Sequence, residues 1–206
     1  VLVLLLTVGC SEKSKKEPVN IEFSIADGDD TKDPENIENS QTDDGAKVNF
    51  AAIENKEGLQ NGIDVSKWQG KIDWQKVKNA GIDFAIIRIG YRAENGRLYR
   101  DSNADYNIQQ AQKAGVLVGV YFFSTAVNQN EATEEAQWTV SEIKGYQISY
   151  PVVYDCEGFR NSDSRMYNLT AEQRTQNAAA FLDTVKKSGY DGMFYGSKTD
   201  LEDNTA

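Results

Sequence analysis

Residues 84–123 read FAIIRIGYRAENGRLYRDSNADYNIQQAQKAGVLVGVYFF, and they carry the strongest structural signal in the chain. Both ends of the stretch are apolar runs, Phe84–Ile89 and Val116–Phe123, which is typical of strands buried on both faces. Between them, Ala104–Ala114 has the spacing of an amphipathic helix, and Gly115 follows as a stop signal. A buried strand, a helix and a second buried strand predict a parallel βαβ unit.

The same alternation continues on both sides of this unit. We expect further strands at Ile63–Val65, Pro151–Cys156 and Met193–Tyr195, and helices at Asp73–Ala80, Glu131–Ile143, Ala171–Lys187 and after Ser197. Five such strands leave two α/β architectures open, a doubly wound sheet and a (β/α) barrel. No strand is followed by a glycine-rich phosphate-binding motif, so a nucleotide-binding version of either fold is not expected.

Composition narrows the chemistry that the chain can perform. Its 206 residues include 32 acidic and 22 basic side chains, for a net charge of -10, which argues against a nucleic-acid partner. It has no histidine, so histidine-based triads, dyads and metal sites are excluded, and proton transfer must use carboxylates, Lys, Tyr or Cys. The two cysteines, Cys10 and Cys156, exclude a disulfide framework and a Cys-rich zinc site. We expect no metal and no cofactor.

The chain begins with the apolar run VLVLLLTV, followed by Gly9-Cys10 and a polar stretch. The run is too short to span a bilayer and fits the end of a secretory signal, so the chain is expected to be clipped at its start. Gly9-Cys10 is similar to a bacterial lipobox, although Thr7 stands where Leu is usual. We therefore expect a lipid anchor on Cys10 and a place on the outer face of the cytoplasmic membrane. An ordinary signal peptide with an incidental Cys10 thiol, and a secreted protein, is the alternative.

Residues 11–60 contain 13 acidic and 6 basic side chains, two of the three prolines and no sustained apolar period. Such a segment cannot bury enough apolar surface to offset the entropy of ordering its backbone. We predict a partial lipoprotein signal at 1–10, an acidic disordered linker at 11–60 and a catalytic domain at 61–206.

The strand PVVYDC runs directly into an acidic pair, Asp155 and Glu157. Residues i and i+2 of a strand point to the same face, with Cα atoms about 6.5–7 Å apart. Two acids this close repel each other, so one of them should hold a proton near neutrality. Glycosidic cleavage needs such a pair: one acid protonates the leaving oxygen, and the other carboxylate stabilises the oxocarbenium-like centre. Two solvated loop acids are the alternative. Cys156, between them, is expected to be buried rather than nucleophilic.

The other strands of a (β/α) barrel would bring further side chains to the same end, since barrel chemistry gathers at the carboxyl ends of the strands. Asp64 lies in a short apolar strand and needs a partner or a function, with capping of the next turn as the alternative. Trp68 and Tyr121 lie near strand ends and offer faces on which a sugar ring can stack. Arg88 and Tyr195 complete the set of expected substrate contacts.

Four segments together resemble glycoside hydrolase family 25, the lysozymes or N-acetylmuramidases: GIDVSKWQGKIDW (62–74), GIDFAIIRIGYR (81–92), VGVYFFS (118–124) and PVVYDCEG (151–158). The resemblance covers roughly residues 61–197. It implies an irregular TIM-like (β/α)5β3 barrel, of which this chain would hold about the first five βα units and lack the C-terminal strands with the acid they carry.

The resemblance also implies an activity, the cleavage of the β-1,4 bond between N-acetylmuramic acid and N-acetylglucosamine. It implies Glu157 as the general acid, Asp155 as the residue that orients the substrate acetamido group, Asp64 as a third acid and Tyr121 as a substrate contact. Phe122 stands where the family often has histidine. The implied partner is the glycan strand of peptidoglycan, acted on by a monomer.

Two other functions are alternatives to this activity. A chitinase-like barrel would need acids at positions that here hold Val153 and Tyr150, so its motif fails. A catalytically dead or truncated barrel, acting as a wall-binding surface lipoprotein, stays open at this point.

Overall fold

The computed structural model describes residues 3–6, 22–24 and 60–203 of the chain. Cys10, and with it the expected lipidation site, lies outside the described residues. So does the expected acidic linker, except for residues 22–24, which form a short strand, and Gln60, which begins the first strand of the domain.

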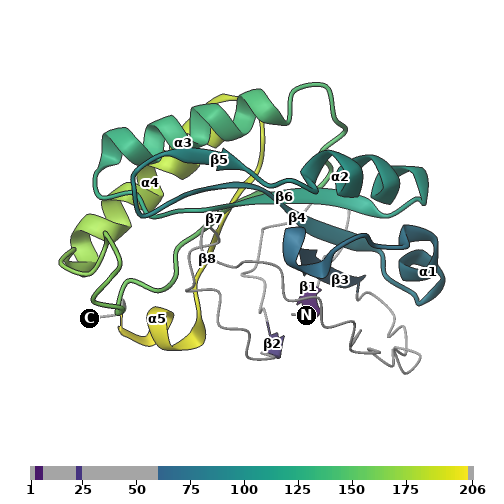
Figure 1. Cartoon of the computed structure of the whole chain (residues 1–206), viewed down its shortest axis with the longest axis horizontal. Coiled ribbons are helices and arrows are strands. Elements are labelled where there is room, and N and C mark those ends of the chain that lie inside the picture. The colour runs from purple at the N-terminus through teal and green to yellow at the C-terminus, as the bar shows by residue number, and fades with distance from the viewer. Residues whose placement is uncertain (1–2, 7–21, 25–59, 204–206) are drawn as a thin grey trace, which may run out of the picture.

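Five parallel strands form the body of the sheet, and each is followed by one helix (Figure 1). In sheet order the strands are β3 (Gln60–Val65), β4 (Phe84–Arg92), β6 (Leu117–Phe123), β7 (Val152–Asp155) and β8 (Gly192–Tyr195). The helices that follow them are α1 (Trp74–Asn79), α2 (Ala104–Lys113), α3 (Gln129–Glu142), α4 (Ala171–Lys187) and α5 (Lys198–Asp203). The predicted five βα units of a TIM-like barrel are therefore confirmed.

Three further strands were not expected from the sequence. β1 (Val3–Leu6) pairs antiparallel with β3, and β2 (Glu22–Ser24) pairs with β1. β5 (Leu98–Arg100) folds back antiparallel on β4 through a turn at Asn95-Gly96, where Gly96 has φ +81°. An Asn-Gly pair is a strong hairpin signal, so the sequence did contain the information for β5.

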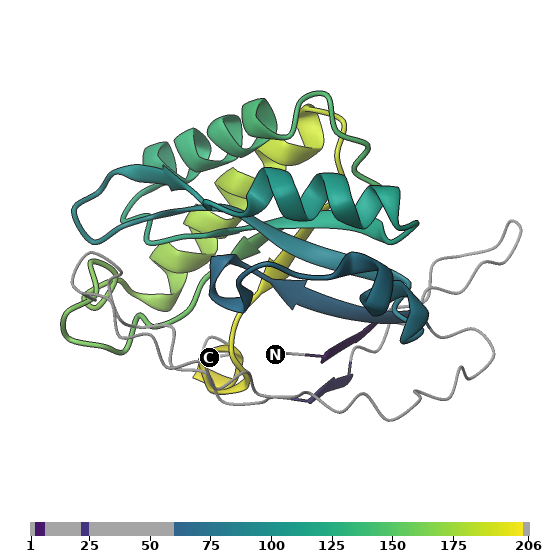
Figure 2. The same cartoon turned by 45° about the vertical axis from the view of Figure 1, so that its right-hand side comes forward.

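The two faces of the parallel sheet carry different cores. Alternate strand residues such as Ile87, Phe122 and Tyr154 face the helices and pack with Trp74 and Phe181 in the larger core. The opposite set forms a smaller core of Phe84, Ile86, Tyr121 and Val153. Figure 2 shows the sheet curling from β3 to β8 with α2, α3 and α4 together on one side. The smaller core thus lines the inner face of the curled sheet.

The helix boundaries follow their capping residues. Asp73 accepts a hydrogen bond from the Lys76 amide at the start of α1. Thr170 and Gln173 form a reciprocal capping box at the start of α4. α3 begins two residues earlier than expected because Asn128 caps it. Among the described residues, the helices are too short or too polar to cross a membrane.

Candidate functional site

The ends of β6, β7 and β8 place three side chains in one row on the inner face. Asp155 pairs with Phe123 on one side and with Tyr195 on the other. Asp155 is only 6% exposed, so this acid forms part of the wall of the site and is not a solvated loop acid. Tyr195 is half-buried beside it. Neighbouring strands lie about 4.8 Å apart, so Asp155 and the Tyr195 backbone are direct neighbours.

Glu157 follows β7 by two residues and is half-buried. Cys156, between the two acids, donates its amide to the Tyr195 carbonyl at 3.1 Å and buries its side chain in the larger core. Burial raises the pKa of the Cys156 thiol to about 12, so it stays protonated at neutral pH. The prediction that Cys156 is buried is confirmed. Its side chain points to the helix side of the sheet, between the two acids Asp155 and Glu157 in sequence.

Arg88 and Tyr121 form a second pair, one row nearer the amino ends of the strands. Both residues are largely buried, at 6% and 9% exposed. Arg88 donates its Nε to Asp101 Oδ2 at 2.8 Å, and its guanidinium lies 5.5 Å from the centre of the Tyr91 ring. The Nε atom of Arg88 is therefore committed to a protein carboxylate, and any substrate contact must use the remainder of the guanidinium.

Asp64 lies on the same inner face, at the last position but one of β3. It pairs with Ile86 of β4, whereas the Arg88–Tyr121 pair lies two residues further along that strand. The half-buried Asp64 is separated from β7 by β4 and β6 in the sheet order. The structure thus brings Asp155, Glu157 and Tyr195 together at one end of the sheet and Asp64 onto the opposite side of the curled face.

Trp68 is held out from the domain by a well-anchored turn. It is 48% exposed and lies in the 3-10 turn Lys67–Gln69 that follows β3. Ser66 caps this turn in a reciprocal capping box with Gln69, so the capping role considered for Asp64 falls to Ser66. The Lys67 ammonium lies 5.0 Å from the centre of the Trp68 ring. A large aromatic exposed on an ordered turn fits the expected sugar-stacking surface.

Asp101 anchors this turn, and the sequence analysis missed it. Its Oδ2 accepts the Arg88 Nε and the Lys67 amide at 2.8 and 3.0 Å, and its Oδ1 accepts the Asn103 amide at 2.9 Å. Asn103 in turn donates to the Gly70 carbonyl at 3.1 Å. The Asp101 side chain is fully buried. An acid directly after a short hairpin carried no motif that would have marked it, because Arg88 and Lys67 lie 13 and 34 positions away and meet it only in the folded chain.

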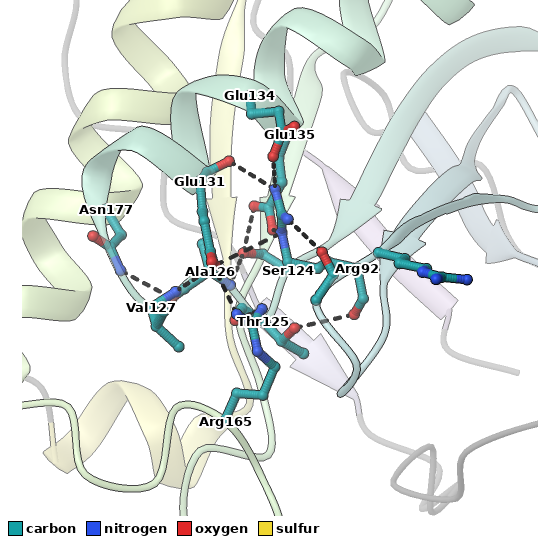
Figure 3. A network of polar contacts seen from close by, with 12 residues as sticks. Arg92, Ser124, Thr125, Ala126, Val127, Glu131, Glu134, Glu135, Arg165 and Asn177 are labelled. Carbon is teal, nitrogen blue, oxygen red and sulfur yellow. Dashed lines mark hydrogen bonds and ion pairs between the residues drawn. The ribbon is translucent and has the colours of Figure 1, made fainter.

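A second buried polar network lies behind the carboxyl ends of β4, β6 and β7 (Figure 3). Arg92 donates to Glu135 Oε1 and Glu134 Oε2, both at 2.7 Å, and Glu135 is fully buried. Ser124 donates its hydroxyl to Glu135 Oε2 at 2.6 Å and also lies 3.0 Å from the Tyr154 hydroxyl. The sequence analysis did not predict this network, because adjacent acids on a helix, such as Glu134 and Glu135, are normally exposed to solvent.

Burial raises the pKa of Glu135 to about 7, against the lowering effect of its bonds to Ser124 and Arg92. The pKa of Arg92 is itself raised, because its bonds to Glu134 and Glu135 outweigh the effect of burial. A raised pKa for both Arg92 and Glu135 is consistent. The single positive charge of Arg92 is shared among Glu131, Glu134 and Glu135, so it does not fully offset the burial of Glu135. Desolvation is therefore the stronger influence on Glu135.

In the described part of the chain, no group of three or more Cys, Asp or Glu side chains is arranged to hold a metal ion.

These features can be compared with known proteins. The sequence profile of Glycosyl hydrolases family 25 matches residues 63–205, the whole of the βα-repeat domain apart from its first strand residues. The chain belongs to glycosyl hydrolase family 25.

Among family 25 relatives, Lysozyme M1 of Streptomyces globisporus is 36% identical over 119 residues, which cover 56% of this chain and 38% of the relative. The modular autolysin LytC of Streptococcus pneumoniae, solved in complex with a synthetic peptidoglycan ligand, matches with a TM-score of 0.61 and 27% identity, covering 70% of this chain and 34% of that one. The bacterial lysozyme of Streptomyces coelicolor matches with a TM-score of 0.51 and 28% identity, covering 66% and 61%. The chain thus spans little more than a third of the length of the first two.

Proposed function

We propose that the chain supplies the catalytic part of a peptidoglycan hydrolase, a lysozyme that cleaves the β-1,4 bond between N-acetylmuramic acid and N-acetylglucosamine. The observation that carries the proposal is the end of β7, where buried Asp155 and half-buried Glu157 lie two residues apart in a chain without histidine. Membership of family 25 and the likeness to proteins named lysozyme support it. The peptidoglycan ligand bound by LytC supports the choice of substrate.

In this proposal Glu157 is the general acid. Its carboxylic acid gives a proton to the bridging oxygen as the bond from that oxygen to the sugar C1 breaks, and the departing sugar leaves as an alcohol. A water molecule then adds to C1 and returns one proton to the Glu157 carboxylate. The balance is one water consumed for each glycosidic bond cleaved, with Glu157 restored.

Asp155 supplies negative charge next to the centre where positive charge develops. Its position in the wall between β6 and β8 removes it from bulk water, which strengthens its effect on a cationic transition state. The family resemblance gives it a further role in orienting the acetamido group of the substrate. Asp64 adds a carboxylate on the far side of the inner face, and Trp68 and Tyr121 offer aromatic surface to the sugar rings.

We also propose that Cys10 carries a lipid that holds the protein on the outer face of a bacterial cytoplasmic membrane. The support is the sequence alone, an apolar run ending in Gly9-Cys10 before a polar, acidic stretch. Cys10→Ala should move the protein from the membrane to the soluble fraction after cell lysis. A variant that stays with the membrane, its signal processed normally, would contradict the anchor.

The activity is tested by the ends that the protein creates. Purified peptidoglycan is digested, the soluble fragments are reduced with borohydride, and the new termini are identified by mass spectrometry. A lysozyme yields fragments that end in reduced N-acetylmuramic acid. Fragments ending in reduced N-acetylglucosamine would indicate the other glycosidic bond, and binding to the wall without release of fragments would indicate the catalytically dead barrel.

A further inference from the structure

The Arg92–Glu135 network has no place in the proposed reaction, although it contains a fully buried carboxylate close to the strand that carries the acid pair. Buried ion pairs contribute little to stability on balance, because desolvation offsets the attraction. A role in holding geometry is the alternative, and the contacts of Ser124 indicate what is held here.

Ser124 follows β6 and holds β7 at two consecutive residues. Its amide donates to the Asp155 carbonyl at 2.8 Å, and its hydroxyl oxygen lies 3.0 Å from the Tyr154 hydroxyl. The Ser124 residue is fully buried and Tyr154 is 1% exposed, so neither bond competes with solvent. The position of Asp155 relative to β6 thus depends on where Ser124 is fixed.

Glu135 fixes the Ser124 side chain. The Ser124 hydroxyl has one proton, and above about pH 7, where Glu135 is charged, it gives that proton to the carboxylate at 2.6 Å. The Tyr154 hydroxyl must then supply the proton of its own bond to Ser124, and the Ala126 amide also donates to the Ser124 oxygen at 3.1 Å. Arg92 holds the other oxygen of Glu135 at 2.7 Å. The hydrogen bonds thus run in one direction, from Tyr154 through Ser124 to Glu135.

Further contacts tie the same network to the loop after β7. Glu131, one turn before Glu135 on α3, accepts from Arg165 at 2.9 Å, and Arg165 also donates to the Thr125 carbonyl at 3.3 Å. The Arg165 amide donates to Glu94 at 2.7 Å. Figure 3 shows Arg92, Ser124, Glu131 and Glu135 converging between α3 and the strand ends. Both sides of Glu157, the strand before it and the loop after it, are therefore held by α3.

We propose that Glu135 is a positioning residue for the hydrolase reaction, acting through Ser124 on β7 and so on Asp155 and Glu157. The proposal rests on the proposed function, since it assigns a role in that reaction. It predicts that disturbing Glu135 lowers the rate of the chemical step while leaving substrate binding largely intact, because Glu135 is buried on the helix side of the sheet and faces the larger core.

The test is Glu135→Gln in the full-length protein, with steady-state kinetics on soluble glycan strands at a pH above about 7, where wild-type Glu135 is charged. The glutamine amide has one oxygen, so it can accept from Arg92 or from Ser124 but not from both. It therefore either loses the Arg92 bond or turns its NH2 group to Ser124 and reverses that bond. We expect kcat to fall about 10-fold with KM unchanged within about 2-fold, since a misplacement of ~1 Å can cost ~10²-fold. Glu142→Gln is the matched control: it removes the carboxylate that pairs with Arg100 at the end of the same helix.

Two further variants keep the proposal falsifiable if Glu135→Gln folds poorly. Tyr154→Phe removes only the hydroxyl and keeps the ring, whose centre lies 4.9 Å from the centre of the Phe181 ring. It should lower kcat in the same way as Glu135→Gln. Ser124→Ala combined with Glu135→Gln should be no slower than the slower single variant, because both act on one path. Full activity in folded Glu135→Gln or Tyr154→Phe, or losses that simply multiply in the double variant, would overturn the proposal.

Amide hydrogen exchange at residue 124 gives a readout that does not depend on activity. This amide bonds the Asp155 carbonyl, so Glu135→Gln should speed its exchange about 10-fold, and Glu142→Gln should not. Unchanged exchange would contradict the link from Glu135 to β7. Wild-type protein without hydrolase activity would contradict the proposed function, and the exchange result would still decide whether Glu135 holds β7.

Discussion

Arg88 and Asp101 form a buried ion pair, with 2.8 Å between Arg88 Nε and Asp101 Oδ2, and side chains that are 7% and 0% exposed. The same Asp101 oxygen accepts the Lys67 amide. One carboxylate therefore fixes both an arginine on the inner face and the turn that presents Trp68, two residues that we propose as substrate contacts.

Asp101→Asn should destabilise the domain and weaken substrate binding together. The amide retains only one oxygen for three donors and leaves Arg88 without its carboxylate, and breaking a buried pair costs about 3–5 kcal/mol. Denaturant unfolding measures the loss, and Asp73→Asn is the control, since its pair with Lys76 is exposed. A loss in Asp101→Asn as small as in that control would contradict the anchoring role.

Trp68→Ala should raise KM on glycan strands about 10-fold with little change in kcat. Stacking of one base on an aromatic side chain contributes about 1–3 kcal/mol in nucleic-acid complexes, and we expect a sugar ring on Trp68 to contribute at the lower end of that range. Its effect on Tm should be small because the side chain is already 48% exposed. Leu117→Ala is the control, as an exposed apolar residue at the amino end of β6, opposite the site. Equal KM values for Trp68→Ala and wild type would remove Trp68 from the substrate surface.

The raised pKa of Glu135, about 7 against an ordinary 4.5, predicts a pH dependence of stability. The native state holds the proton more tightly than the unfolded chain, so stability from this group is present below pH 4.5 and is lost as pH rises to about 7, at about 1.4 kcal/mol per pH unit. Ser124, Arg92 and Glu131 act on the charge of Glu135, and Glu135 in turn acts on the buried Tyr154 and Cys156.

Unfolding free energies of wild type and Glu135→Gln, measured between pH 4.5 and 7.5, test this dependence. Their difference should shift in favour of the variant by about 3 kcal/mol as pH rises. Glu142→Gln should show no comparable shift. A difference between wild type and Glu135→Gln that is constant with pH would mean that Glu135 titrates in its ordinary range.

Cys156 should resist alkylation in the folded protein, because it is 2% exposed and burial raises its pKa to about 12. Maleimide labelling in a Cys10→Ser background measures this reactivity, followed by mass spectrometry. Labelling should appear only with denaturant, in step with unfolding. Rapid labelling without denaturant would show that the end of β7 opens in the native state, and would contradict the packing of Cys156 in the larger core.

The sequence predicted those parts of the fold that local patterns determine. The five parallel strands and their helices follow from apolar runs and stop signals such as Gly115, and the inner-face placement of Asp155 and Tyr121 follows from strand alternation. The supports of the site could not be predicted in the same way. Asp101 contacts residues 13 and 34 positions away, and Glu135 contacts Arg92 43 positions away, so only the folded chain shows that they meet.

The catalytic role of Glu157 is tested by the rate at which Glu157→Gln releases new reducing ends from purified peptidoglycan. The amide keeps the size and hydrogen-bonding shape of the side chain but has no proton to give the leaving oxygen. We predict that release falls ~10²–10⁴-fold while wall binding and the unfolding transition stay close to wild type. Release at the wild-type rate, from a folded variant that yields N-acetylmuramic acid ends, would contradict the assignment of Glu157 as the acid.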